Sequence, residues 1–357
     1  MPETVSRRDL LAAGASLALA AQAHAVPKKA ARMTKTLDVH AHFLPPVYQE
    51  ALTSAGLRTV DGGMPVPEWS PERALAVMDQ TGIAGALLSV SSPHIGFVEK
   101  AQAPKLARAI NDYAAELCRA HPDRFGAYAL LPLPDMAASL KELDRALDQL
   151  KLDGVALPTH AEGRYLGDPI FVPLLEALNA RKATVFIHPT SPACFESFGL
   201  ELPAPMIEFP FDTTRTAVSL LYSGALRRFP DINFILPHAG GTLPFLAPRI
   251  AGVGSIPVLG ERAVPLPEAL TALTRFYYDT ALSVTPQQIA ALRALAPVSQ
   301  IVYGTDFPFA PAERVVVSEA IFAALPFTPE EQAAVRFGNA ARLFKPFASR
   351  CGCGGSH

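Results

Sequence analysis

The sequence predicts an α/β fold in which eight strands close into a (β/α)8 TIM barrel. Short apolar runs with the character of buried strands alternate with helical patterns through most of the 357 residues. Such alternation produces parallel strands joined by helical crossovers. Eight repeats over this length favour a closed barrel of about 250 residues with insertions. An open doubly wound sheet is the alternative, but it is disfavoured because neither G-x-G-x-x-G nor G-x-x-x-x-G-K-[ST] occurs.

The eight expected strands are short runs rich in apolar, β-branched and aromatic residues. A buried strand has this composition, and Gly or Pro directly after it marks where the chain leaves the sheet. In chain order the strands cover residues 36–43, 84–90, 125–131, 154–158, 184–188, 233–238, 276–280 and 301–306. Between them, apolar residues recur near positions i, i+3, i+4 and i+7, as on the buried face of a helix. Helices are therefore expected at residues 72–81, 104–120, 137–150, 169–180, 213–228 and 286–295.

The first strand ends in two imidazoles one residue apart, His40 and His42. Side chains two positions apart on a strand point to the same face. Two neutral imidazoles on one face can share a divalent ion at about 2.0 to 2.1 Å, so this pair suggests a metal site. The alternative is a pair of partly exposed histidines in a loop.

Three later strands also end in a residue that can bind a metal or work beside one. These residues are His188, His238 and Asp306, and each is followed within two positions by Pro or Gly. The C-terminal ends of the strands form the rim of a (β/α)8 barrel on which active sites are built. The three residues are therefore expected to lie on the same rim as the histidine pair.

The first 25 residues are not expected to belong to the barrel. Arg7 and Arg8 precede a short Ala- and Leu-rich run that ends in Ala23-His24-Ala25, which has the layout of a cleavable export signal. Paired arginines at this place resemble a twin-arginine signal. Residues 1–25 are therefore predicted to direct the protein to the periplasm. The alternative is an anchoring helix or a disordered tail, although the apolar run is shorter than the roughly 20 residues that span a bilayer.

The composition favours a small molecule as the partner. The formal net charge of −2 gives no reason to expect nucleic acid or, after removal of the signal, an anionic membrane. Four cysteines are too few and too scattered for a disulfide framework. Residues 26–348 are expected to form the barrel. Residues 349–357, rich in glycine, are expected to be a disordered tail.

Four motifs give the sequence a family resemblance. They are His40-Ala41-His42-Phe43-Leu44-Pro45-Pro46, Phe186-Ile187-His188-Pro189, Pro237-His238-Ala239-Gly240-Gly241 and Tyr303-Gly304-Thr305-Asp306-Phe307-Pro308. In order and spacing they resemble the amidohydrolase-related decarboxylases, which include aminocarboxymuconate semialdehyde, γ-resorcylate and 6-methylsalicylate decarboxylases. The tracts at residues 63–70, 91–93 and 208–215 most resemble the 6-methylsalicylate type.

The resemblance implies a site with one divalent ion, zinc or, as the alternative, manganese. Its ligands would be His40, His42, His188 and Asp306, and His238 would act beside the ion as a base or hydrogen-bond partner. No lysine follows the fourth strand, where binuclear amidohydrolases place a carbamylated bridging ligand. One ion is therefore expected rather than two.

The resemblance also implies a homodimer. Arg249 matches an arginine that, in the semialdehyde decarboxylase, reaches the substrate carboxylate of a neighbouring subunit; the alternative is an ordinary surface salt bridge. A partner arginine near the first loops is not recognisable, so a second carboxylate on the substrate is not indicated.

Further side chains near the predicted rim are candidates for substrate contacts. His160 ends the fourth strand and would either contact substrate or hydrogen-bond behind the ligands. Four aromatic side chains could sandwich an aromatic ring, although rings of this kind are also common in cores. They are Phe43, Trp69, Phe195 and Phe309.

The expected function is decarboxylation of a small aromatic or dienoic carboxylic acid. Protonation makes the ring carbon that bears the carboxylate tetrahedral, and CO2 leaves as aromaticity returns. Asp306 is the expected proton donor, because a desolvated or anionic setting can keep a carboxyl group protonated, and His238 would orient water or the phenol oxygen. A hydrolase that opens a lactone or amide with His238 as base is the alternative. A third is an exported binding protein with a fossil metal site.

Overall fold

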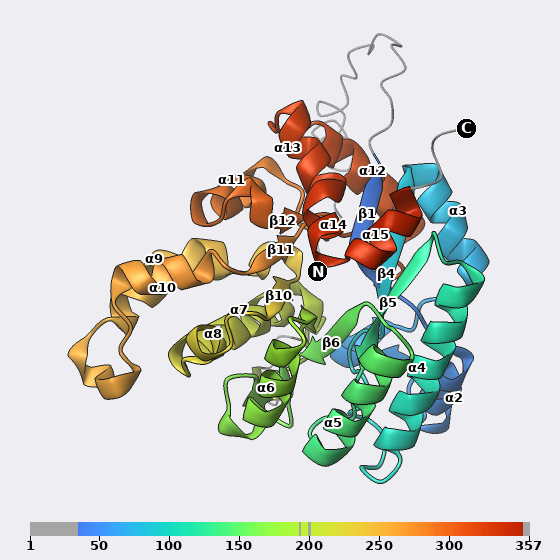
Figure 1. The fold of residues 1–357 in the computed structure, drawn as a ribbon, viewed down its shortest axis with the longest axis horizontal. Coiled ribbons are helices and arrows are strands. Elements are labelled where there is room, and N and C mark those ends of the chain that lie inside the picture. The colour runs from blue at the N-terminus through green and yellow to red at the C-terminus, as the bar shows by residue number, and fades with distance from the viewer. Residues whose placement is uncertain (1–34, 193, 199–200, 353–357) are drawn as a thin grey trace, which may run out of the picture. The chain divides into compact units, whose positions relative to one another are not determined.

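The computed structural model describes residues 35–192, 194–198 and 201–352 of the chain (Figure 1). The predicted export signal at residues 1–25 lies outside these ranges. Within them, no helix is both long enough and apolar enough to cross a bilayer.

Eight parallel strands form one sheet, and each begins within one residue of the start of an expected strand. Neighbours in the sheet follow chain order, as a barrel with right-handed helical crossovers requires. The strands are β1 (Thr36–His42), β4 (Ile83–Ser89), β5 (Phe125–Leu130), β6 (Gly154–Pro158), β9 (Thr184–His188), β10 (Asn233–Leu236), β11 (Tyr277–Asp279) and β12 (Ile301–Val302). Two short hairpins stand apart, β2 (Thr59–Val60) with β3 (Met64–Pro65), and β7 (His160–Ala161) with β8 (Arg164–Tyr165).

The sheet closes where the last strand meets the first. The amide of Val39 donates to Tyr303 O at 2.9 Å, and that of Asp306 donates to His40 O at 2.7 Å. Ala41 forms a parallel bridge with Phe307 just beyond. Gly304 permits this approach, because a Cβ there would lie 2.8 Å from the Cβ of His40. The predicted (β/α)8 barrel is confirmed.

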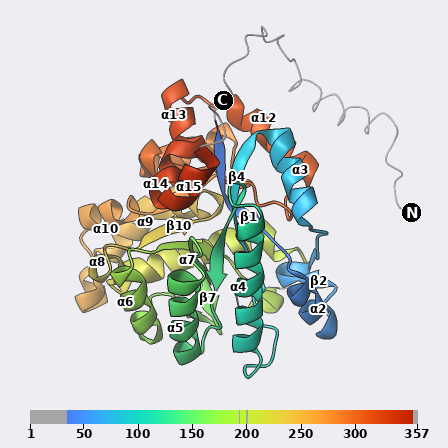
Figure 2. The same cartoon turned by 45° about the vertical axis from the view of Figure 1, so that its right-hand side comes forward.

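Helices surround the barrel and connect its strands (Figures 1 and 2). Local signals set several of their ends: α3 begins after Ser70, whose side chain accepts from the amide of Arg73, and ends just before Gly82, which adopts the left-handed conformation. The helices are α2 (Pro46–Ser54), α3 (Pro71–Thr81), α4 (Ala103–Ala120), α5 (Met136–Asp144), α6 (Val172–Ala180), α7 (Glu208–Tyr222), α8 (Ala225–Arg228), α9 (Leu243–Gly254), α10 (Leu266–Leu273), α11 (Pro286–Leu295), α12 (Ala312–Ala323), α13 (Pro329–Ala333), α14 (Asn339–Leu343) and α15 (Lys345–Gly352).

Helix α15 corrects the expected start of the C-terminal tail. The helix runs to Gly352, so the boundary predicted at residue 349 falls inside it. Phe347 and Cys351 are buried and pack with residues from inside the barrel, such as Leu37 and Leu87. The glycines after Ser349 suggested disorder, but this apolar contact outweighs their conformational freedom. Residues 353–357 lie outside the described ranges.

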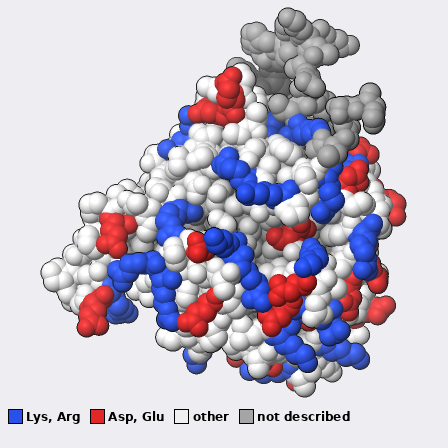
Figure 3. Space-filling model, in the orientation of Figure 1, with Lys and Arg blue, Asp and Glu red and all other residues white. Residues whose placement is uncertain are grey.

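Charges of both signs are interspersed on the face of the molecule in Figure 3. Among the described residues, ion pairs link neighbouring helices: Arg228 of α8 pairs with Glu176 of α6 at 2.5 Å, and Arg181, just after α6, pairs with Asp144 of α5 at 2.7 Å. This mixed pattern fits the net charge of −2.

Candidate metal centre and active site

Four of the side chains predicted at the strand ends form a compact group of potential metal ligands. His40 and His42 come from the end of β1, His188 ends β9, and Asp306 lies just beyond β12. All four are buried, and one ligand atom from each lies within 4.8 Å of the others. The barrel therefore places these residues, far apart in the sequence, at one point on its C-terminal rim.

The spacing of the donor atoms fits a bound cation. His40 Nε2 lies 3.1 Å from His42 Nε2, and these nitrogens lie 3.3 and 3.0 Å from Asp306 Oδ1. Metal bonds of about 2.0 to 2.1 Å in tetrahedral geometry place neighbouring ligands roughly 3.3 Å apart. Oδ1 of Asp306 is buried without a hydrogen-bond partner, as expected of an oxygen that serves a metal. The arrangement supports a single divalent ion.

The other ring nitrogen of each histidine ligand meets an oxygen. His40 Nδ1 lies 2.7 Å from Asp279 Oδ2, and His188 Nδ1 lies 2.9 Å from Pro189 O. His42 Nδ1 lies 2.9 Å from the hydroxyl of Ser89. Donation from Nδ1 leaves the lone pair of Nε2 free to face the ion, and such contacts orient metal-binding histidines.

Asp279 was not predicted as a functional residue, although it ends an expected strand as the ligands do. Besides holding His40, its carboxylate accepts from the backbone amide of His238 at 2.8 Å and from that of Ala281 at 3.0 Å. His238 has a φ of 54°, an uncommon conformation for a residue with a side chain. One carboxylate thus fixes both a ligand and the residue beside the ligand cluster. An acidic residue after an apolar run was the available signal.

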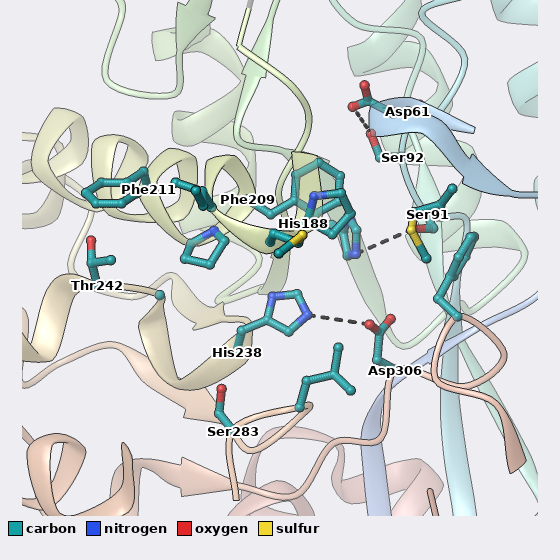
Figure 4. Close-up of a pocket in the computed structure, with 18 of the residues that line it drawn as sticks. Asp61, Ser91, Ser92, His188, Phe209, Phe211, His238, Thr242, Ser283 and Asp306 are labelled. Carbon is teal, nitrogen blue, oxygen red and sulfur yellow. Dashed lines mark hydrogen bonds and ion pairs between the residues drawn. The ribbon is translucent and has the colours of Figure 1, made fainter. Parts of the chain in front are cut away.

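His238 lies beside the ligand cluster, at Asp306. Its Nε2 is 3.6 Å from Asp306 Oδ2, and Figure 4 shows the imidazole directed at that carboxylate. The Nδ1 atom is buried without a hydrogen-bond partner among the described residues. His238 can therefore exchange a proton with the site without being needed to complete the ligand set.

Electrostatic interactions in the cluster are strong. Burial acts to lower the pKa of His40, but the carboxylates of Asp279 and Asp306 raise that pKa to about 10. Burial acts to raise the pKa of Asp306, yet charged His40 and the other histidines around the carboxylate hold that pKa well below its ordinary value. Burial keeps the pKa of His188 well below its ordinary value. A cation at the centre would replace the proton on His40, since histidines bind metals in their neutral form.

A cavity of about 480 Å³ opens beside the cluster, and His188, His238 and Asp306 form part of its wall. Much of the rest is apolar, from Phe209 and Phe211 in the first turn of α7 and from Met206 and Ile207 just before it. Among the described residues, no lysine or arginine contributes to this wall. A carboxylate that enters the cavity would therefore depend on a bound ion for positive charge.

Of the predicted substrate contacts, Phe309 lines the cavity, with its ring 5.4 Å from that of His42. Phe43 and Trp69 are buried and pack edge to face at 6.1 Å, away from the cavity wall. These two rings are therefore part of the core.

The remaining three predicted contacts also lie elsewhere. His160 Nε2 is 3.1 Å from Ser191 O, and its Nδ1 accepts from the amide of Gly163, so His160 fixes two loops. Phe195 begins a short 3₁₀ turn and is not among the described residues of the wall. Arg249 is exposed on α9.

Sequence reasoning missed several residues of the wall. Asp61 and Ser92 come from loops after β2 and β4, and Leu282 and Ser283 follow β11. The tract at residues 208–215, noted above for its resemblance, supplies Phe209 and Phe211. Ser92 and the last group lie in tracts that carry the resemblance, whereas Asp61, Leu282 and Ser283 had no signal in the sequence.

The sequence also matches known proteins. Residues 37–345 match the amidohydrolase family model. The chain is 39% identical to the decarboxylase macB of Penicillium terrestre, covering 78% of this chain and 86% of the relative. It is 37% identical to a 6-methylsalicylic acid decarboxylase of Penicillium expansum, and the match covers 86% of this chain and 95% of that relative.

Solved structures share the fold. An amidohydrolase II structure superimposes with a TM-score of 0.81 at 34% identity, covering 87% of this chain and all 100% of the other. A dihydroxybenzoic acid decarboxylase from Polaromonas, solved with bound manganese and the inhibitor 2-nitroresorcinol, superimposes with a TM-score of 0.75 at 23% identity, covering 88% and 97%. With the family model matched over almost the whole barrel, the chain belongs to the amidohydrolase family.

Proposed function

We propose that the protein is a metal-dependent, non-oxidative decarboxylase of a small carboxylic acid, either aromatic and hydroxybenzoate-like or dienoic. The observation that carries this proposal is the cluster of His40, His42, His188 and Asp306, which borders an apolar, aromatic-lined cavity with His238 at its side. Relatives at 37% and 39% identity that bear the name decarboxylase support it.

Zinc is our first assignment for the single ion, because three imidazoles and one carboxylate suit it. Manganese, present in the Polaromonas structure, is the second. When bound, the ion would act as a Lewis acid toward the carboxylate and phenol oxygens of the substrate. A single ion also agrees with the end of β6, where Pro158, Thr159 and His160 supply no lysine.

The protein side chains would deliver the proton. Asp306 was the predicted donor, but a carboxyl group that binds a cation does so as a carboxylate, so it must first receive the proton that it passes on. His238 Nε2, 3.6 Å from Asp306 Oδ2, is the group from which it can come. We therefore assign protonation of the substrate carbon to the pair of His238 and Asp306. The bond between the ring carbon and the carboxylate then breaks, and its electrons restore the aromaticity of the ring as CO2 leaves.

A hydrolase of the same family is the competing function. Hydrolysis of a lactone or amide would use the same four ligands, with His238 as the base that activates water. The two reactions differ in their products, because a decarboxylase releases CO2 whereas a hydrolase leaves a new carboxylate.

Elemental analysis of purified protein, combined with a CO2-release screen over hydroxybenzoates, tests the proposal. We expect about one equivalent of ion per chain and CO2 from at least one ortho-hydroxy acid. Release of a new carboxylate from a lactone or amide, without CO2 from any acid, would favour the hydrolase. Protein purified from its native compartment without metal would instead favour the binding protein.

We also propose that the protein is exported to the periplasm. The support is the pair Arg7 and Arg8 ahead of the apolar run that ends near Ala25. Replacing both arginines by lysine should leave the enzyme in the cytoplasm, as read by cell fractionation. Unchanged fractionation would contradict the twin-arginine assignment.

A further inference from the structure

Asp61 is an acidic residue of the cavity wall that the proposed chemistry does not use. It begins the short 3₁₀ turn Asp61–Gly63 between β2 and β3, far in sequence from the strand ends that carry the ligands. Three donors converge on its Oδ2: the hydroxyls of Ser92 and Thr190, both at 2.5 Å, and the amide of Ser191 at 2.6 Å. Figure 4 shows the contact with Ser92.

These donors hold Asp61 as a carboxylate. Burial acts to raise its pKa, but the hydrogen bonds from Ser191, Ser92 and Thr190 lower it. All of the side chain's hydrogen bonds within the described part of the chain end on Oδ2, and no ion pair joins it to a lysine or arginine there. Its second oxygen, Oδ1, therefore accepts no hydrogen bond from that part of the chain, and Asp61 is a residue of the cavity wall.

Two neighbouring serines connect Asp61 to the metal centre. Ser92, which contacts Asp61, directly follows Ser91, whose hydroxyl lies 3.5 Å from Nε2 of the ligand His188. All four residues line the same cavity. A ring held at the metal centre therefore has the carboxylate of Asp61 in the wall around it.

We propose that Asp61 determines substrate specificity: its free oxygen accepts a hydrogen bond from a hydroxyl or amino group on the substrate, and its charge repels a second carboxylate. This inference rests on the proposed function of the same cavity. The wall offers no lysine or arginine among the described residues, so a second carboxylate beside Asp61 would meet its negative charge with no basic side chain of the same wall to balance it. The substrate is then an aromatic monocarboxylic acid with an additional hydrogen-bond donor.

Binding of unreactive probes tests this assignment. The probes are pairs of 2-nitrophenols that carry either a hydroxyl or a carboxylate at the same ring position, titrated calorimetrically into the metal-loaded protein. The nitro group stands in for the departing carboxylate, so binding is read whether or not the protein is a decarboxylase. For at least one ring position, wild type should bind the hydroxylated probe at least about tenfold more tightly.

The Asp61→Asn variant should remove this preference. An asparagine Oδ1 can still accept from Ser92, Thr190 and Ser191, while its Nδ2 would offer a donor to the cavity in place of the acceptor. The affinity ratio should therefore fall at least about tenfold. Asp61→Glu retains the charge and should still disfavour the carboxylated probe. Glu68→Gln is the matched control, because Glu68 is an exposed acid shortly after β3 that pairs with Arg73.

Two results would overturn the inference. One is a wild-type ratio near one at every ring position. The other is an affinity ratio in Asp61→Asn that equals the wild-type ratio, provided that the variant binds metal and unfolds at the wild-type temperature. Asp61 would then serve only to hold neighbouring loops together. If the asparagine variant does not fold, the glutamate variant decides. Loss of the preference for the hydroxylated probe in Asp61→Glu would then contradict the inference. Failure to release CO2 bears only on the proposed reaction.

Discussion

At the scale of single residues, the ligand cluster makes separable predictions for metal binding and for catalysis. His40→Ala or His188→Ala should lose both bound metal and activity, because three remaining donors do not close the coordination shell. Plasma emission after dialysis measures the metal content. Nearly one equivalent of metal in either variant would remove that histidine from the ligand set.

His238→Asn should behave differently. The imidazole stands beside Asp306 at 3.6 Å and is outside the cluster of four ligands, so the variant should retain its metal. Turnover should fall by about 10² to 10⁴, the usual contribution of a general acid or base. Steady-state rates of CO2 release, together with metal analysis, separate the two effects. Loss of metal would assign His238 to the ligand set instead.

Asp279→Asn tests the residue that contacts both the ligand His40 and the backbone of His238. An asparagine keeps the size of the side chain but weakens its contact with His40 Nδ1, now 2.7 Å from Oδ2. Metal affinity should fall by about 10- to 100-fold. Competition with a chelator of known affinity measures the change. Asp135→Asn, at the N-cap of α5, is the control, and equal affinities in both variants would contradict the role of Asp279.

The four potential metal ligands can be predicted from the sequence, but which aromatic side chains line the cavity cannot. His40, His42, His188 and Asp306 could be found because each ends an apolar run, and the ends of parallel strands must meet on one rim. The rings of Phe43 and Trp69 could not be assigned, because a place near the rim does not say which way a side chain points. Their packing partners are set by the tertiary fold.

At the scale of elements, the interior of the barrel depends on close packing against the C-terminal helix. A Cβ at Gly85 of β4 would lie 2.5 Å from Cys351 Sγ and 2.9 Å from Phe347 Cζ. Gly85→Ala should therefore destabilise the protein by about 1 to 3 kcal/mol through overpacking. Urea unfolding followed by circular dichroism measures the loss.

Matched variants show whether the contact with α15 is responsible. Adding Cys351→Ala should restore part of the stability, because it removes the atom nearest to the new methyl group. Gly252→Ala on α9, where a Cβ would meet nothing within 4 Å, should be neutral or stabilising. Equal destabilisation in the single and double variants would show that α15 does not restrain Gly85.

The elements differ from their predicted bounds for local reasons. The last strand was expected at residues 301–306 but is Ile301–Val302, because the chain turns to place Asp306, with a φ of 68°, at the metal centre. The helix expected at 213–228 breaks at Gly224, which has a φ of 76°. Asp61 was missed because its place depends on Ser92 and Thr190, which are distant in sequence.

At the scale of the whole molecule, the predicted homodimer has a candidate surface on α9. Phe245, Arg249 and Val253 follow one another at intervals of four and so share a helix face. The two apolar residues are 83% and 53% exposed, and Val258 just beyond the helix is 82% exposed. Apolar side chains exposed together on one face are typical of protein interfaces. Figure 1 shows α9 and α10 extending outward from the strands.

We predict that two copies associate through this face and that Arg249 grips a carboxylate at the partner's site, a task for which its fork of donors is suited. Sedimentation at micromolar concentration should show a dimer, and Phe245→Asp should dissociate it by placing a charge in the apolar contact. Arg249→Ala should raise KM or lower turnover while metal content is unchanged. Arg119→Ala, an exposed arginine on α4, should have no such effect. A monomer with full activity at nanomolar dilution would contradict the shared site and leave Arg249 as a residue of the barrel's own surface.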